Sequence, residues 1–450
     1  MCEPGRAGPP APASCGGRSL NGARSAHASA DLSGTRRRLT ITIFGGVGLG
    51  ATALYAASTV APLVAVDITG SRALSGLPVA MSITGTAFGA TLLSRVMARY
   101  GRRPGLVIGY ATAVAGAALA VLATVQSSFV LLLAALLVIG SGNSATQLAR
   151  YAAADAHPAR HRTTVIGWVV WAATIGAVAG PTLGTYVAGR LAASGLPSFS
   201  GAFLVTAAAF ALGALAFAVL LRPDPGSLRS PADDIEHDAT NPADESGAAW
   251  SPIRVALVGL VVSQCVMVLI MVMSPVHLRQ HGGAVSAIGM MMSSHTLGMF
   301  AFTPVTGHLA QRFGNVRVLT AGLMLLTAAG IGGALAPEGS APALAAALFL
   351  LGLGWSCGFV AASGLLARGA VLAERARRQG SADTIVFGAA ALASLSSGVL
   401  LSLVGYAGLC LIGSALAGTA AVVVHVRSAA PSLTEPPGTR RLGHSTPDRR

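Results

Sequence analysis

Long apolar stretches recur along the chain from Thr40 onward, and short polar segments separate them. A helix needs about 20 predominantly apolar residues to cross the hydrocarbon core of a bilayer. The pattern predicts spans near residues 40–62, 73–94, 104–125, 129–150, 163–189, 200–221, 252–275, 285–307, 316–336, 342–367, 383–404 and 406–427. We therefore predict an all-α integral membrane protein with twelve transmembrane helices.

Polar segments divide the chain into bundles and tails. Pro, Gly and seven acidic residues between Asp224 and Glu245 are typical of a solvated linker rather than a domain. The N-terminal segment lacks the apolar core of a secretory signal. We expect a disordered cytoplasmic tail at 1–38, a six-helix bundle at 39–221, an acidic cytoplasmic linker at 222–251, a second six-helix bundle at 252–427 and a cytoplasmic tail at 428–450.

Composition supports this class. Only 10% of the 450 residues are charged and 53% are hydrophobic, whereas soluble proteins carry about 25% charged residues. A single water-facing fold is therefore excluded. All thirty basic residues are arginine, and the formal net charge is +14. Such an excess is typical either of nucleic-acid binding or of a membrane protein whose basic loops set its orientation.

The positions of the arginines favour orientation. If both termini are cytoplasmic, Arg72, Arg190 and Arg279 are in external loops, and the other twenty-seven of the thirty are on the cytoplasmic side. Basic residues concentrate in cytoplasmic loops of membrane proteins. We therefore expect a multi-pass protein of the cell membrane with both termini cytoplasmic. A nucleic-acid partner is not needed to explain the charge.

An internal repeat relates the two predicted bundles. Equivalent residues at offsets of 213 and 212 positions are Arg99 and Arg312, Tyr100 and Phe313, Gly101 and Gly314, and the segments Gly140-Ser-Gly142-Asn143 and Gly352-Leu-Gly354-Trp355. Two parallel six-helix repeats that share a site near the bilayer midplane form a transporter architecture. The repeat therefore predicts two pseudo-symmetric bundles around a central site.

The loop after the second span resembles the motif G-x-x-x-D-R-x-G-R-R of the major facilitator superfamily. The chain retains four of its positions and departs at two: it has Arg99, Gly101, Arg102 and Arg103, but Ser94 replaces the first glycine and Ala98 the acid. In the second half Gly307, Arg312 and Gly314 match, and Gln311 replaces the acid. The resemblance extends over roughly residues 39–427.

This resemblance implies a cytoplasmic gate that locks the two halves together in the outward-facing state. Its residues would be Arg99, Gly101, Arg102, Arg103, Arg312 and Gly314. Glycine permits a tight turn, and arginines can bond the carbonyls at helix C-termini. Ala98 and Gln311 leave the usual Asp–Arg pair without its acid. The alternative is that these arginines only set orientation.

The fifth predicted span carries Gly176, Gly180, Pro181 and Gly184. Glycines four positions apart lie on one helix face and allow close approach of another backbone, and an internal proline bends a helix. The spacing is similar to the exporter-associated motif of the superfamily, G-x-x-x-G-P-x-x-G, which favours efflux over uptake. The alternative is general glycine-rich packing.

Proton coupling requires a titratable group within the membrane. The predicted spans have no carboxylate at mid-depth, because Asp67, Asp155 and Asp383 are at their ends. His295, in the eighth span, is the candidate, since imidazole titrates near neutral pH. A lone histidine among apolar residues is also compatible with a purely structural, hydrogen-bonded role.

The first, fourth, seventh and tenth spans line the substrate cavity in this superfamily. Their polar or aromatic residues predict contact with a substrate through Tyr55, Asn143, Gln147, Gln264 and Trp355. Polar side chains within apolar spans usually face the interior, and a tryptophan ring offers a stacking or cation–π surface. Methionines around the seventh and eighth spans could form an adaptable pocket or simply pack between helices.

No metal site or cofactor is expected. His277 and His281 are four residues apart, which makes soft-metal passage conceivable, but an external-loop surface is the simpler reading. The five cysteines have neither disulfide nor zinc spacing. Walker A, GxSxG, HExxH and CxxC motifs are absent from the sequence, so neither an enzyme nor an ATP-driven pump is predicted.

These observations predict a secondary active transporter that exports small, amphipathic or cationic organic molecules by alternating access, coupled to protons. Its expected partners are the lipid bilayer, the small-molecule substrate and protons, and it is expected to act as a monomer. Two alternatives are a permease for uptake of a nutrient or metabolite, and a membrane scaffold or receptor that retains the fold without transport.

Overall fold

The computed structural model of the chain describes residues 17–71, 74, 76–192, 197, 199–228, 251–282, 285–368 and 372–429. All regular structure within these ranges is helical. Most of the predicted linker and nearly all of the predicted C-terminal tail lie outside the described residues.

The first half of the chain forms six long helices that match the first six predicted spans. Their bounds are α1 (Gly17–Thr69), α2 (Leu77–Tyr100), α3 (Arg102–Val125), α4 (Phe129–Asp155), α5 (Arg162–Ala192) and α6 (Ser200–Leu220). Two short 3-10 helices, η2 (Ala159–His161) and η3 (Pro225–Leu228), follow α4 and α6.

The second half repeats this order of antiparallel helices. Its helices are α8 (Pro252–Gln280), α9 (Val285–Phe300), α10 (Thr303–Phe313), α11 (Asn315–Leu335), α12 (Ala341–Leu366) and α13 (Leu372–Ala429). Among the described residues, ten helices are long and apolar enough to cross a membrane. The prediction of an all-α membrane fold is confirmed.

One element differs from its predicted single span. The span expected at 285–307 is broken between α9 and α10, because Pro304 has no N–H to continue the helical hydrogen bonds. At this break the Thr303 hydroxyl donates to the Phe300 carbonyl at 2.9 Å, which supplies a partner for a carbonyl at the end of α9. The last two predicted spans meet at Gly405, as expected, because the backbone of α13 is non-helical there, with φ 69° and ψ 178°.

The N-terminal tail also differs from the expectation of disorder up to residue 38. The first helix extends beyond its apolar stretch, and residues 32–38 are helical. Thr40 and Thr42 donate their hydroxyls to the Arg36 and Arg38 carbonyls. Arg38 in turn donates to the carbonyl of Arg222, which follows α6. The Arg38 bond ties α1 to the segment that follows α6.

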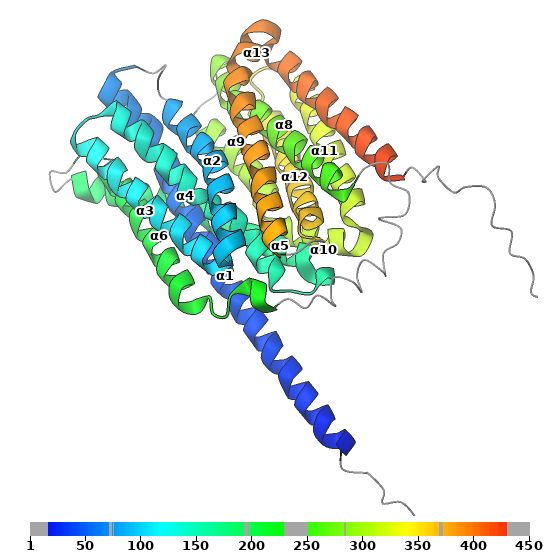
Figure 1. Cartoon of the computed structure of the whole chain (residues 1–450). Helices are drawn as coiled ribbons and strands as arrows, with labels where there is room; N and C mark the ends of the chain where they lie inside the picture. The colour runs from blue at the N-terminus through cyan, green and yellow to red at the C-terminus, as the bar shows by residue number, and fades with distance from the viewer. Residues whose placement is uncertain are drawn as a thin grey trace, which may run out of the picture.

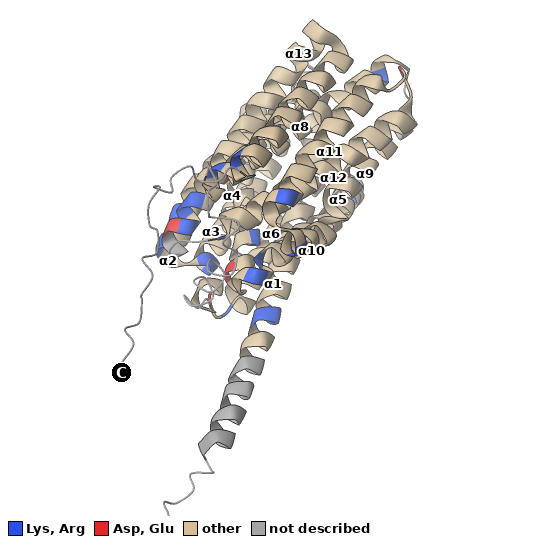
Figure 2. Cartoon of the chain, turned by 90° about the vertical axis from the view of Figure 1, so that its right-hand side faces the viewer, with Lys and Arg blue, Asp and Glu red and all other residues tan. Residues whose placement is uncertain are grey.

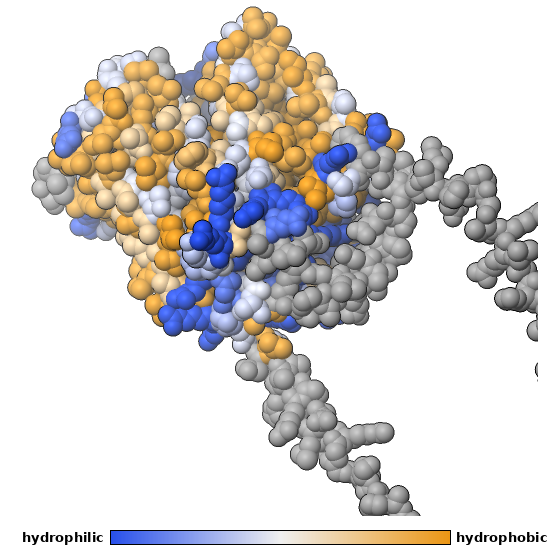
Figure 3. Space-filling view, viewed as in Figure 1, coloured by the Kyte–Doolittle hydropathy of each residue, from blue (hydrophilic) through white to orange (hydrophobic). Residues whose placement is uncertain are grey.

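The two halves lie side by side, and α1 protrudes from one end of the bundle (Figure 1). We call this end the tail side; it contains the turns after α2, α4, α6 and α10. Arginines gather toward this end (Figure 2). At the opposite end, which we call the open side, a hollow separates the two lobes of the surface (Figure 3).

The internal repeat is visible in the backbone. Gly101 joins α2 to α3 as a single-residue turn with φ 100°, and Gly314 joins α10 to α11 with φ 93°. The N–H of each glycine bonds the carbonyl four residues earlier at 3.0 Å. Side chains rarely tolerate these angles. The same turn is therefore built twice, as the matching sequences predict.

Close helix packing repeats in the same way. Gly140 and Gly142 of α4 leave no room for a side chain against Ser82 of α2 and Ala113 of α3. The equivalent Gly352 and Gly354 of α12 pack against Met299 of α9 and Leu326 of α11. In each half, the same pair of glycines thus allows the central helix to pack closely against its neighbours.

The predicted exporter-type glycines form the contact between α5 and α1. A Cβ atom on Gly180 would lie 2.6 Å from the Thr52 carbonyl oxygen and 2.8 Å from Cβ of Tyr55. Gly176 faces the backbone of Ala51 and Thr52, and Gly184 faces Ala56. The stripe therefore brings α5 close to a helix that lines the centre of the molecule.

Replacing Gly180 with alanine should lower the Tm of the purified protein, since the added methyl group meets backbone atoms. Overpacking of this kind costs about 1–3 kcal/mol. Gly45→Ala is the matched control, because nothing lies within 4 Å of its added Cβ, and its Tm should be unchanged or slightly raised. Thermal unfolding in detergent measures both, and equal losses would contradict the packing role of the glycine stripe.

Candidate functional site

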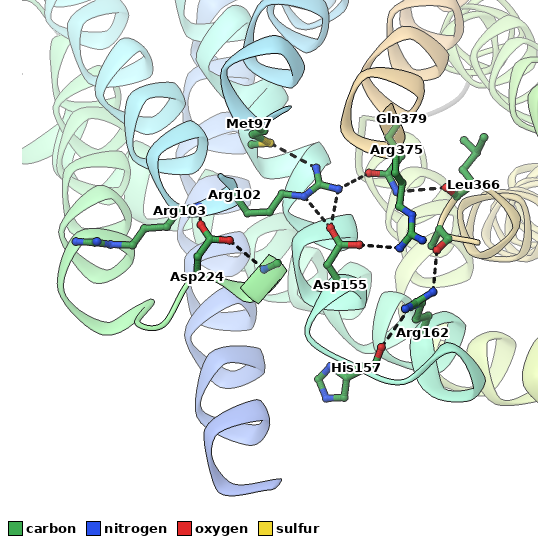
Figure 4. Close-up of polar contacts among 12 residues, drawn as sticks. Met97, Arg102, Arg103, Asp155, His157, Arg162, Asp224, Leu366, Arg375 and Gln379 are labelled. Carbon is green, nitrogen blue, oxygen red and sulfur yellow. Dashed lines mark hydrogen bonds and ion pairs between the residues drawn. The ribbon is translucent and has the colours of Figure 1, made fainter. Parts of the chain in front are cut away.

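A buried network of charged side chains joins the halves on the tail side (Figure 4). Asp155, at the end of α4, accepts from Nε and Nη2 of Arg102 at 2.8 and 2.7 Å through Oδ2. Its Oδ1 lies 3.2 Å from Nη1 of Arg375 on α13. Arg102 also donates to Oε1 of Gln379 at 2.6 Å. We call these four residues the latch.

The latch is dry and fully paired at its acid. The side chains of Arg102, Asp155 and Arg375 are at most 1% exposed. A buried charge is tolerated only when it is paired and hydrogen-bonded. Because the partners of Asp155 belong to different halves, the pairing of its charge requires the two halves to be in contact on this side.

Further contacts extend the closed tail side. Arg162 donates from Nε to the His157 carbonyl at 3.2 Å and from Nη1 to the Ala367 carbonyl at 3.3 Å, which links α5 to the end of α12. The hydroxyls of Thr91 on α2 and Thr384 on α13 are 2.6 Å apart. The halves are therefore joined on both flanks of the latch.

His157 lies in the turn between α4 and α5, beside this closed surface. Its Nδ1 is 3.0 Å from the Ala153 carbonyl. Burial lowers the pKa of its imidazole, and the nearby Arg36 and Arg162 add to that effect. His157 is therefore neutral at physiological pH and adds no charge to the arginine-rich turn.

The carboxylate of Asp224, at the start of the predicted linker, caps α3. It accepts from the backbone N–H of Arg103 at 2.9 Å and of Gly226 at 2.9 Å. Arg103 itself donates to the Ala218 carbonyl at 2.5 Å. An anion near a helix N-terminus is favourable. Ala98 supplies no acid in the motif loop, whereas Asp155 and Asp224 provide carboxylates from outside it.

The predicted gate residues are not all brought together. Arg102 reaches the other half, whereas Arg99 and Arg312 are exposed and lie over their neighbours Tyr100 and Phe313, each 5.4 Å from the ring centre. In the second half the contact across the halves comes from Gln311, whose side chain bonds the Thr164 hydroxyl.

A cavity lies between the halves, adjoining the closed tail side. It encloses about 760 Å³, including the part open to solvent, and helices of both halves line it. All five residues predicted to contact substrate line this one cavity: Tyr55, Asn143, Gln147, Gln264 and Trp355.

The walls of the cavity differ in chemistry. On α4, Asn143, Gln147 and Arg150 form a polar wall. On α12, the Trp355 and Phe359 rings stack with centroids 4.6 Å apart and planes at 18°. Asn143 and Trp355 are equivalent positions of the repeat, so the same backbone site carries an amide in one half and an aromatic ring in the other.

Gln264 is a polar residue of the cavity that hydrogen-bonds its aromatic wall. Its Oε1 accepts from Nε1 of Trp355 at 2.7 Å, which fixes the indole plane. Phe300 meets the same indole edge to face, with centroids 5.8 Å apart. Asn143 Oδ1 is buried and accepts no hydrogen bond. The cavity thus offers an indole ring held in a fixed plane, and the Asn143 carbonyl oxygen is buried beside it without a hydrogen-bond partner.

His295 lies outside the residues that line the cavity. It is 1% exposed, and its Nδ1 is 2.9 Å from the Leu348 carbonyl, between α9 and α12. His277 stacks on Tyr406, with centroids 4.1 Å apart, and lies beside His281. Within the described ranges, no group of three histidine, cysteine or acidic residues is arranged to hold a metal ion.

The sequence prediction missed two features of the site, and residue spacing could have identified the first of them. Asn143, Gln147 and Arg150 are at i, i+4 and i+7, which places them on one helix face; Arg150 was assigned only to orientation. Asp155 and Asp383 were placed at span ends, but each is paired with an arginine in the interior. Their partners are distant in sequence, so no local pattern reveals the pairs.

The chain matches the family model described as Major Facilitator Superfamily over residues 43–258 and 255–447. It therefore belongs to the major facilitator superfamily. Members are transporters, which agrees with the prediction of a non-enzymatic protein and with two pseudo-symmetric bundles around a central cavity.

Relatives and solved structures support the same assignment. The chain is 35% identical to the uncharacterized MFS-type transporter YdeG of Bacillus subtilis (strain 168), over 83% of this chain and 87% of that protein. It is 30% identical to the riboflavin transporter RfnT of Brucella anthropi, over 82% and 90%. The structure of the proton:xylose symporter XylE superposes with a TM-score of 0.68 at 16% identity, covering 89% of this chain and 98% of XylE.

Replacing Asp155 with asparagine should strongly destabilise the protein, because both Arg102 and Arg375 lose their charged partner. Removing one member of a buried ion pair costs about 3–5 kcal/mol. Asp67→Asn makes the same change at an exposed carboxylate near the end of α1 and should leave Tm unchanged. A thermal unfolding scan of both variants in detergent checks this, and similar Tm values would show that the latch contributes no stability.

Proposed function

We propose that the protein is a secondary active carrier that moves small organic molecules through its central cavity by alternating access. The cavity carries this proposal, because both halves line it and the latch closes it on the tail side. Rocking of the halves would break the contacts of Asp155 and Arg162 and open the cavity to the tail side. The latch, with Arg102 at its centre, would then act as the gate.

We further propose that the tail side faces the cytoplasm and that the bilayer is the cell membrane. The arginines concentrated at this end favour that orientation. Both termini would then be cytoplasmic, and the hollow on the open side would face outward. We propose a monomer, because described residues of a single chain form both the cavity and the latch.

The cavity favours substrates that combine a flat aromatic ring with polar groups at its edge. The Trp355 ring, held in place by Gln264 and Phe359, would provide a surface for a ring, while Asn143 and Gln147 on α4 would provide hydrogen bonds. The relative named a riboflavin transporter, 30% identical to this chain, supports the same class. Riboflavin is therefore a rational first probe.

For direction, we propose efflux. The support is the stripe of Gly176, Gly180, Pro181 and Gly184, which packs α5 against the cavity helix α1 and matches an exporter-type pattern. Proton coupling is proposed as the driving force, with His295 as the candidate predicted from sequence and the buried Asp383 as a second titratable group. Uptake is the alternative, and the direction of flux under an imposed proton gradient distinguishes the two.

Replacing Trp355 with alanine should reduce riboflavin flux into proteoliposomes at least about tenfold, since loss of aromatic stacking and of an anchored ring costs on the order of 1.4 kcal/mol or more. Trp168→Ala removes an indole that is half exposed on the outer surface and should retain flux. Radiolabelled riboflavin measures both. Equal flux in the two variants would place the substrate path elsewhere.

The proposed orientation can be tested with the native cysteines. Cys2 and Cys15 belong to the N-terminal tail, whereas Cys265, Cys357 and Cys410 are within helices. A membrane-impermeant maleimide should label Cys2 and Cys15 in inside-out vesicles but not in intact cells. The variant in which both are replaced by serine is the control. Labelling in intact cells would reverse the orientation.

A further inference from the structure

Arg150 differs from the arginines of the latch because it both lines the cavity and pairs across the halves. Among the described residues around the cavity, it is the only one with a charged side chain. Its Nη2 lies 2.7 Å from Oδ1 of Asp383 on α13, and the two side chains are 2% and 1% exposed. The cavity therefore has a cation in its wall, and the matching anion comes from the opposite half.

Asp155 and Asp383 both pair with an arginine of the opposite half, but they differ in how many of their carboxylate oxygens are hydrogen-bonded. Both oxygens of Asp155 are bonded to arginines. Asp383 uses only Oδ1, and its Oδ2 is buried without a hydrogen-bond partner. An unsatisfied buried oxygen retains a desolvation cost. The Arg150–Asp383 pair is therefore much less complete than the latch and easier to exchange.

The guanidinium of Arg150 contacts two rings and a hydroxyl. Its Cζ lies over the Tyr151 and Phe359 rings, 4.3 and 4.4 Å from the ring centres, and its Nη2 donates to the Tyr151 hydroxyl at 3.0 Å. Nε donates to the Ser363 hydroxyl at 3.1 Å, and Nη1 donates to the Gln147 carbonyl. Nη1 carries a second N–H. A carboxylate from a ligand could accept two parallel bonds, one from Nη1 and one from Nη2, whereas Asp383 accepts one.

We infer that the transported molecule carries an anionic group and that Arg150 binds this group in exchange for the carboxylate of Asp383. This inference rests on the proposed carrier function and specifies its substrate class as organic anions, such as aromatic carboxylates. No covalent bond changes; one carboxylate replaces another on the same guanidinium.

The exchange is tied to the position of the halves. Asp383, Ser363 and Phe359 all belong to the second half, so parting the halves on the tail side removes all three from Arg150. The freed guanidinium then accepts an anion from that side. Closing the halves returns Asp383 to Arg150 and displaces the anion toward the open side. The pair thus favours release on the side opposite to loading, which agrees with efflux.

Benzoate and benzamide test this inference, because they have the same ring but only benzoate is an anion. Binding to the purified full-length protein is measured by calorimetry and by the ligand-induced change in Tm. Asp383→Asn removes the competing carboxylate and should tighten benzoate binding at least about tenfold, since the pair-broken state is the one that binds. Benzamide binding should not change.

The double variant Arg150→Gln/Asp383→Asn removes both charges and keeps the buried site neutral. It should lose benzoate binding, and benzoate should raise the Tm of the wild type but not of the double variant. This comparison holds even if Asp383→Asn alone fails to fold. Equal benzoate affinity in wild type and Asp383→Asn, no benzoate binding to either, or retained binding in the double variant would each overturn the inference.

The result is separable from the carrier proposal. Riboflavin flux that depends on Trp355, together with a negative benzoate result, would leave the carrier intact and reject the anion exchange. A positive benzoate result without flux of any tested anion would retain the Arg150 site and reject the carrier.

Discussion

Burial of guanidinium charge between two separable bodies is the constraint on which the rest of the structure depends. Arg102, Arg150, Arg162 and Arg375 are among the largest fully buried side chains of the molecule. Each must keep a partner, because an unpaired charge in an apolar interior is strongly unfavourable. Several of those partners are in the opposite half. These pairs therefore stabilise the arrangement in which the halves are in contact on the tail side. In any other arrangement, water or a ligand would have to replace the lost partners of the arginines.

The two halves share a backbone plan but have diverged at the cavity. The glycines that seat α4 and α12, and the single-residue turns at Gly101 and Gly314, are repeated. The side chains that project from this common frame are not: Asn143 is opposed by Trp355. The helix packing is therefore the same in both halves, whereas the cavity walls differ: one carries an amide where the other carries an aromatic ring.

Much of the fold could be predicted from sequence, because apolar length and glycine spacing are local signals. Helix bounds agree closely for α3 and α6. The five cavity residues were chosen as the polar or aromatic residues of the four spans that the family resemblance implies line the cavity, and all five line it. The break at Pro304 was missed because hydropathy alone was used to set that span, although an internal proline is a local signal. The continuation of α1 was missed because it lies outside the apolar stretch. The pairs of Asp155 and Asp383 were missed for a stronger reason: residues more than 200 positions apart are brought together only by the packing of the halves.

The one-residue turns at Gly101 and Gly314 have a mechanical consequence. A connection of a single residue has almost no slack, so α2 cannot tilt without rotating α3, nor α10 without α11. Thr91 and Ser94, which touch α13, are on α2. If the halves move as proposed, a displacement at that contact would pass through the one-residue turn from α2 to α3, so that neighbouring helices of one half would shift together.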